Sequence, residues 1–290
     1  MLALSGKKTG YHARRSLYGN IIVFGFIALL GAFSALPFVF AVITSLKPIN
    51  ELMEFPPRFS VTRPTFENYE ELYRLATNMW VPLSRYIFNT VVVAVAGTVL
   101  HVFFASMAAY PLAKHRFPGK NVIFSVIVMA LMFVPQVTFI PQFILMAELG
   151  LVNTFIALIL PWIGASLGLF LMKQFIEQIP DALLEAARID GASEFKTFFS
   201  IVLPNSMPAV LTIVIFQFIN LWNYAPKELV FSESLKVFRM AMESIVASDP
   251  IARMGAGAAA SVILMIPPII VFIALQQKVV ETMTFAGIKG

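Results

Sequence analysis

Residues 86–113 read YIFNTVVVAVAGTVLHVFFASMAAYPLA and contain no Lys, Arg, Asp or Glu. At 1.5 Å of rise per residue, a helix over this stretch is roughly 42 Å long, against a hydrocarbon core of about 30 Å. Five further charge-free runs, each of at least 24 residues, lie at 16–46, 121–147, 149–172, 197–226 and 254–277. The runs lack the short alternating pattern of a membrane β-strand. The sequence therefore predicts an all-α membrane protein with six transmembrane helices.

The composition supports the same class of protein. Of 290 residues, 59% are hydrophobic and 13% are charged, and the mean hydropathy is +0.82. In a soluble domain about a quarter of all residues are charged, so a water-soluble globular fold is excluded. The chain has no cysteine, which excludes a disulfide scaffold, a thiolate zinc site and an iron–sulfur protein. We interpret the net charge of +5 first as a signal of membrane topology, and not of a nucleic-acid partner.

Basic residues indicate the orientation in the membrane. They concentrate in the N-terminal tail and in the loop after the second run, at Lys7, Lys8, Arg14, Arg15, Lys114, Arg116 and Lys120. The loop between the third and fourth runs carries only Glu148. Because short basic segments stay on the cytoplasmic side, both termini are expected on the cytoplasmic side of the cell membrane.

The domain organisation follows from these runs. We expect a cytoplasmic tail at 1–19, a first transmembrane helix at 20–46, an extracytoplasmic loop at 47–85, a core of five transmembrane helices at 86–278 and a cytoplasmic tail at 279–290. Within the core, Pro135 and Pro141 are flanked by Gln136 and Gln142. This pattern predicts an interrupted helix that lines a cavity.

The cytoplasmic segment 178–204 is too long for a simple turn. Pro180 can open a helix, and Gly191 can end it in the left-handed conformation. Ser193 can begin a second short helix, in which we expect Phe195, Phe198 and Phe199 to face the membrane body. The segment thus predicts a helix–turn–helix against the inner face of the bundle.

The same segment resembles a known signature. Glu185-Ala186-Ala187, then Gly191, then Ile201-Val202-Leu203-Pro204 follow the spacing of the EAA motif in permease subunits of bacterial ATP-binding-cassette (ABC) importers. Other segments resemble the carbohydrate-uptake, maltose-type branch with six spans, among them Thr65-Phe66-Glu67-Asn68-Tyr69, Asn89-Thr90, Arg116-Phe117-Pro118-Gly119, Leu149-Gly150-Leu151-Val152-Asn153-Thr154 and Trp222-Asn223. The resemblance covers roughly residues 15–290.

This resemblance implies the type I ABC importer permease fold, with residues 181–199 as a cytoplasmic coupling helix that docks on an ATPase. It assigns Glu185 as the polar anchor and the small side chains of Ala186 and Ala187 as a close-contact surface. Arg188 and Asp190 add charge to that surface, and Gly191 forms the turn. The implied partners are a dimer of cytoplasmic ATP-binding subunits, a second permease in a heterodimer, an extracytoplasmic solute-binding protein and membrane lipid.

The chain is not expected to be an enzyme. Its Gly-Lys pairs, Gly6-Lys7 and Gly119-Lys120, lack the spacing of a phosphate-binding loop. We therefore expect no catalytic residue, no metal site and no cofactor bound by this chain, with ATP and Mg²⁺ held by the partner ATPase.

Polar residues near the end of the fifth run are candidates for a solute path. Gln217, Asn220 and Tyr224 lie at i, i+3 and i+7, and Trp222 and Asn223 lie beside them. Amides with an aromatic ring suit the hydroxyls and the apolar face of a sugar; Gln136 and Gln142 join this set. The alternative is that these groups only make interhelical hydrogen bonds.

Two other functions compete with sugar import. One is an EAA-type permease for a non-sugar solute, although an anionic cargo would favour basic residues that the six runs lack. The other, less favoured, is an ion-coupled secondary transporter, which usually needs carboxylates or basic groups at mid-membrane. A membrane-embedded enzyme is disfavoured because His12, His101 and His115 are widely scattered.

Overall fold

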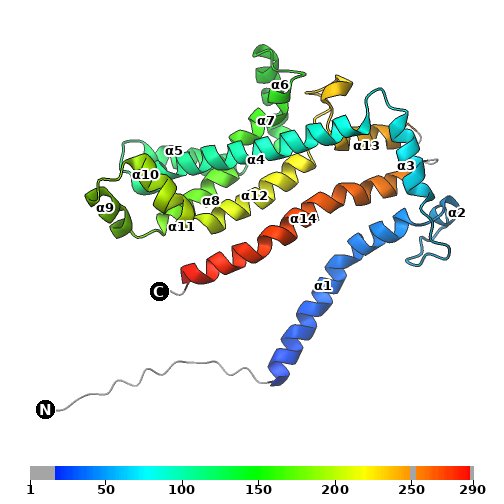
Figure 1. The fold of residues 1–290 in the computed structure, drawn as a ribbon, viewed down its shortest axis with the longest axis horizontal. Helices are drawn as coiled ribbons and strands as arrows, with labels where there is room; N and C mark the ends of the chain where they lie inside the picture. Colours follow the sequence, from blue (N-terminus) through cyan, green and yellow to red (C-terminus); the bar gives the residue numbers. More distant parts are fainter. Residues whose placement is uncertain (1–16, 249–252, 288–290) are drawn as a thin grey trace.

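The computed structural model describes residues 17–248 and 253–287, and its regular structure within these ranges is helical. Figure 1 shows an elongated bundle along which α4 and α14 run lengthwise. The elements are α1 (Leu17–Ser45), α2 (Ile49–Leu52), α3 (Glu67–Thr77), α4 (Leu83–Lys114), α5 (Lys120–Ala130), α6 (Pro135–Glu148), α7 (Phe155–Ile163), α8 (Ser166–Glu177), α9 (Asp181–Ile189), α10 (Glu194–Thr197), the π-helix η1 (Phe198–Val202), α11 (Leu203–Asn205), α12 (Met207–Trp222), the 3-10 helix η2 (Glu233–Leu235), α13 (Phe238–Ala247) and α14 (Met254–Gly287).

The long apolar helices agree with the predicted spans. Four stretches are long and apolar enough to cross a membrane: 18–45, 83–114, 155–177 and 254–281. Two further pairs, α5 with α6 and α10–α11 with α12, qualify together but are bent by 110° and 76°. With each bent pair counted as one span, the described residues contain six, as the sequence predicts.

A proline explains where the first of the two bent spans breaks. Pro135 stands at the first turn of α6, and Val134 before it is extended, with φ −78° and ψ 145°. A proline disfavours helical conformation in the residue that precedes it, so α5 cannot run straight into α6. This confirms the interruption expected at Pro135. Pro204 lies near the second bend, whereas α14 continues as a helix through Pro267 and Pro268.

Helix α4 is the central element of the bundle. It packs against α7, α8 and α12, and α12 also packs against α14. Val93 and Ala94 of α4 are buried in a cluster with Leu221 of α12, and near its other end Ala109 is buried with Met172. Close packing is aided by Gly97, where a Cβ atom would come within 2.6 Å of the Leu221 side chain.

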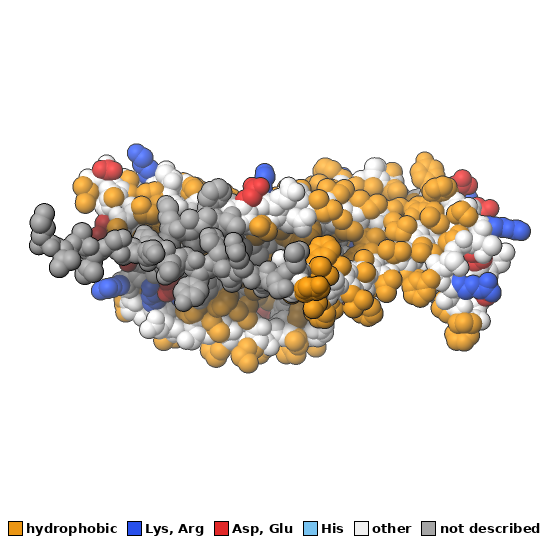
Figure 2. All heavy atoms as spheres, turned by 90° about the horizontal axis from the view of Figure 1, so that it is seen from below, with side chains coloured by type: hydrophobic (Ala, Val, Ile, Leu, Met, Phe, Trp, Pro, Cys, Tyr) orange, Lys and Arg blue, Asp and Glu red, His pale blue; other side chains and the backbone are white. Residues whose placement is uncertain are grey.

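The first helix stands apart from this core. Helix α1 contacts α14, and the most apolar window of α1 has no buried residue. Figure 1 shows α1 diverging from the bundle toward its N-terminal end. Figure 2 shows hydrophobic side chains over much of the described surface between the two ends of the molecule, and most charged ones toward these ends. We call these ends the α9 end and the α13 end after the helices found there.

Candidate coupling loop and solute path

The α9 end carries the predicted helix–turn–helix. Helix α9 follows Pro180, has Asp181 in its first turn, and ends before Gly191, whose φ of +76° is left-handed. The Ser193 hydroxyl accepts a hydrogen bond from the Lys196 amide at 3.3 Å and so caps α10. These local signals are those expected from the sequence, and Figure 1 shows α9 and α10 at one extremity of the bundle.

The two faces of α9 differ in exposure. Leu184 and Ala187 are buried against the bundle, whereas the remaining predicted coupling residues are exposed: Glu185, Ala186, Arg188, Asp190 and Gly191. The predicted pair of alanines is therefore divided, and only Ala186 is available to a partner. Ile189 is 86% exposed beside it.

The phenylalanines of the second helix also differ from the expectation. Phe198 is buried, but Phe195 is 68% exposed and Phe199 is 49% exposed. Phe198 and Phe199 are neighbours in η1, and successive helical residues point about 100° apart, so both cannot face the bundle.

Polar contacts from α4 hold this loop. The Lys114 ammonium donates to Asp181 at 2.8 Å and to the backbone carbonyls of Glu177 and Ile179. The Asp181 carboxyl has a lowered pKa because Lys114 donates to it. Sequence reasoning missed these contacts, although Lys114 stands directly after a charge-free run.

A second set of contacts joins the start of α10 to α4. The Tyr110 hydroxyl donates to Glu194 Oε2 at 2.8 Å, and Arg188 donates to Glu194 Oε1 at 3.1 Å. His115 Nε2 lies 3.4 Å from the same carboxylate. Glu194 is thus the meeting point of α4, α9 and α10.

Two of the predicted path residues share a small cavity of about 250 Å³. Gln217 and Asn220 of α12 line it with Trp162, His101 and the chain around Pro135. Gln217 is buried and donates to the Trp162 carbonyl at 3.1 Å, so its amide also makes an interhelical hydrogen bond. The interrupted helix at Pro135 lines this cavity, as its sequence indicates.

The other path candidates lie elsewhere. The Tyr224 ring packs edge-on against Trp162, with centroids 5.1 Å apart, and Gln142 is half-buried on α6. Gln136 is exposed on α6. Trp222 is buried and donates to the Leu264 carbonyl at 3.0 Å, so its indole joins α12 to α14 and lines neither of the two cavities described in this section.

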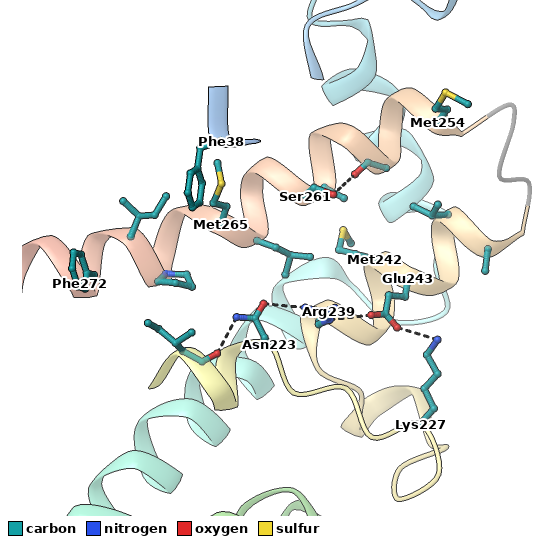
Figure 3. Close-up of a pocket in the computed structure, with 18 residues that line it drawn as sticks. Phe38, Asn223, Lys227, Arg239, Met242, Glu243, Met254, Ser261, Met265 and Phe272 are labelled. Atoms are coloured by element: carbon teal, nitrogen blue, oxygen red, sulfur yellow. Dashed lines mark hydrogen bonds and ion pairs between the residues drawn. The ribbon is translucent and has the colours of Figure 1, made fainter. Parts of the chain in front are cut away.

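Asn223 belongs to a larger cavity of about 1080 Å³ between α12, α13 and α14, which Phe38 of α1 also borders. Figure 3 shows Asn223, Arg239, Glu243 and Lys227 forming a polar chain along one side, with apolar side chains opposite. Arg239 donates to Asn223 at 3.0 Å and to Glu243 at 2.9 Å, and Lys227 lies 3.0 Å from Glu243. Burial raises the pKa of Glu243, but these two cations outweigh it and the pKa is lowered.

Titratable groups elsewhere form no metal-binding cluster: within 17–248 and 253–287, no three His, Asp or Glu side chains are grouped so as to hold an ion. His101 is 1% exposed, and its Nδ1 lies 2.9 Å from the Ile163 carbonyl. It is therefore a packed interior residue.

Comparison with known proteins identifies the family. Residues 101–284 match the family described as the binding-protein-dependent transport system inner membrane component. The chain belongs to this family. It is thus a multi-pass permease subunit of an ABC importer, a transport subunit that in general works with ATPase and solute-binding partners.

Individual relatives agree with this family. The chain is 32% identical to an arabinooligosaccharides transport system permease protein from Halalkalibacterium halodurans, over 93% of this chain and 95% of the relative. It is 30% identical to a diacetylchitobiose uptake system permease protein from Streptomyces coelicolor, over 84% and 80%. A solved bacterial ABC transporter involved in alginate import matches with a TM-score of 0.74 at 22% identity, over 91% of this chain and 98% of that one, which supports the fold.

Proposed function

We propose that this permease subunit imports a sugar or oligosaccharide, and that the exposed face of α9 and α10 docks on a separate cytoplasmic ATPase. The observation that carries the docking role is the surface of the α9 end. Ile189 and Phe195 are largely exposed there among the charged side chains of Glu185 and Arg188. Lipid does not favour such a mixture, whereas large apolar groups with a charged rim are typical of a protein interface.

Orientation follows from the same assignment. The basic residues Lys114, Arg116 and Lys120 lie at the α9 end, so the positive-inside rule puts this end in the cytoplasm and the α13 end outside. Both termini are then cytoplasmic. ATP and Mg²⁺ belong to the ATPase, whose dimer would receive one α9 loop from this chain and one from a second permease in a heterodimer.

The solute path that we propose runs along the small cavity. The amide of Asn220 and the Trp162 ring supply there a hydrogen-bonding group and an apolar face, which together match a sugar ring. The relatives named for arabinooligosaccharide and diacetylchitobiose transport favour the same class of cargo. The polar chain at Asn223 and Glu243 lies near the α13 end, where a solute-binding protein would dock.

Purification of the native complex tests this function. We expect a second permease and an ATPase to co-purify, and the associated binding protein to gain thermal stability with oligosaccharides. Recovery of the chain without any ATPase contradicts the ABC role. A binding protein stabilised only by amino acids or peptides contradicts the sugar assignment and leaves the importer assignment in place.

A further inference from the structure

The backbone connects α9 to the bundle through a break in the helix on each side, so these connections alone would hold it flexibly. On one side, α9 joins α8 through the short break at Gln178–Pro180. On the other side, the chain passes through the π-helix η1 and a 76° bend before α12 begins. Short breaks and helix ends are where changes in φ and ψ are absorbed. A displacement of α9 would therefore be absorbed by backbone rotation at these breaks, unless other contacts transmitted it to the bundle.

Helix α4 supplies such contacts through its last turns. Lys114 has three N–H donors, and three acceptors meet them: Asp181 in α9, and two carbonyls at the end of α8. Its side chain is only 8% exposed. One turn earlier on the same face, Tyr110 donates to Glu194 of α10. Both helices of the loop are thus bonded directly to α4.

The opposite end of α4 is bonded in the same way to the segment before α13. Asn89 is fully buried and donates to the carbonyls of Ser234 and Lys236, at 2.9 Å each. The Thr90 hydroxyl accepts from the Phe238 amide at 2.7 Å, and Tyr86 donates to Glu233 at 3.0 Å. Each of these three α4 residues therefore holds residues 233–238, more than 140 positions along the chain.

We propose that α4 transmits movement between the two ends of the transporter, with Lys114 and Tyr110 as positioning residues at the α9 end and Asn89 at the α13 end. This inference rests on the proposed coupling role of α9. The helix is one element of 32 residues and continues through Pro111. Displacement of α9 by the ATPase moves α4, and α4 moves residues 233–238 through the bonds of Asn89. In the reverse direction, a binding protein at the α13 end reaches the ATPase by the same path.

The test uses the whole complex in proteoliposomes, with binding-protein-stimulated ATP hydrolysis and uptake measured together. Three variants each remove hydrogen-bond donors at one end of α4 with little change in side-chain volume: Lys114→Met, Tyr110→Phe and Asn89→Leu. Lys114→Arg is the conservative rescue. Lys173→Met is the matched control, because Lys173 is also a nearly buried cation near the α9 end but contacts Glu177 of its own helix and the Phe124 ring of α5.

We expect Lys114→Met and Asn89→Leu each to lower stimulation by about tenfold, a usual size for coupling between sites, with co-purification of the ATPase retained. The double variant should lose no more than the worse single variant, because both break one path; independent sites would multiply to roughly a hundredfold. Lys114→Arg should recover most of the stimulation. Tyr110→Phe, which removes a single hydroxyl, should reduce it even if Lys114→Met fails to fold.

Three results would each overturn this role of α4. They are normal coupling in Tyr110→Phe and Lys114→Met, multiplicative losses in the double variant, and an equal loss in Lys173→Met. These results leave the proposed function intact if the wild-type complex couples. A wild-type complex without stimulated hydrolysis contradicts the proposed function itself, and this inference with it.

Discussion

His101 of α4 and Gly168 of α8 lie in direct contact, and a Cβ atom added at Gly168 would lie 2.0 Å from Nε2 of His101. The imidazole is held by its other nitrogen, which is 2.9 Å from the Ile163 carbonyl. The ring therefore cannot simply swing away. The lack of a side chain at Gly168 is what allows α4 and α8 to pack closely here.

Gly168→Ala should lower the thermal unfolding temperature of the purified protein. Overpacking of a close contact costs about 1–3 kcal/mol. Gly164→Ala is the matched control, because a Cβ there meets nothing within 4 Å. Adding His101→Ala to Gly168→Ala should restore part of the loss, since the two residues are coupled. Equal unfolding temperatures for the two alanine variants would show that the contact relaxes freely.

Gly191→Pro should abolish coupling between ATP hydrolysis and uptake. Its φ of +76° lies outside the range near −65° to which proline is restricted, so the turn between α9 and α10 must rearrange. Gly191→Asn is the control, because asparagine tolerates the left-handed region. We expect membrane insertion of both variants and transport by the asparagine variant alone. Uptake by Gly191→Pro at the wild-type rate would exclude a required turn geometry.

Glu185→Lys should weaken binding of the ATPase. The side chain is exposed on α9, and reversal of its charge repels the basic partner group that the docking role requires. Co-purification at increasing salt measures this effect, and Glu148→Lys, on an exposed residue at the end of α6, serves as a control for added charge. If both variants retain the ATPase equally, Glu185 is not an anchor.

Asn220→Leu should raise the KM of uptake several-fold, because it removes a hydrogen-bonding group from the small cavity and leaves an apolar lining. The affinity of the binding protein for the same sugar should stay constant. Asn205→Leu is the comparison, since Asn205 is exposed and bonds the Ile201 carbonyl in its own helical segment. An unchanged KM in Asn220→Leu would place the solute path elsewhere.

The Glu243 cluster should contribute a pH-dependent stability. Because Lys227 and Arg239 hold the folded-state pKa of Glu243 below its ordinary value of 4.5, the stabilisation is present above pH 4.5 and is lost as the pH falls through the lower, folded-state pKa. The unfolding temperature of wild type should exceed that of Glu243→Gln at pH 7, and the difference should shrink below pH 4.5. A constant difference at all pH values would mean that the carboxylate charge is not involved.

The sequence by itself determined the elements whose causes are local. Charge-free runs long enough to span lipid, Pro135 at a helix break and Gly191 after α9 all act within a few residues, so each could be predicted. The EAA spacing also indicated the family, whereas the coupling role of its loop stays a prediction. These features depend on chain length, hydropathy and backbone conformation, and none requires knowledge of a distant neighbour.

Only the tertiary structure decided which side chains meet. Ala186 and Ala187 are identical neighbours, yet only Ala187 turns toward the bundle. Gln217 and Asn220 share the small cavity, whereas Asn223 lines the larger one together with Ile219, four residues before it on another face of α12. Tyr110 meets Glu194 across 84 positions of sequence, and such pairing has no local signature. The packing of α4 against its neighbours decides these contacts, because it brings together groups that no periodic pattern relates.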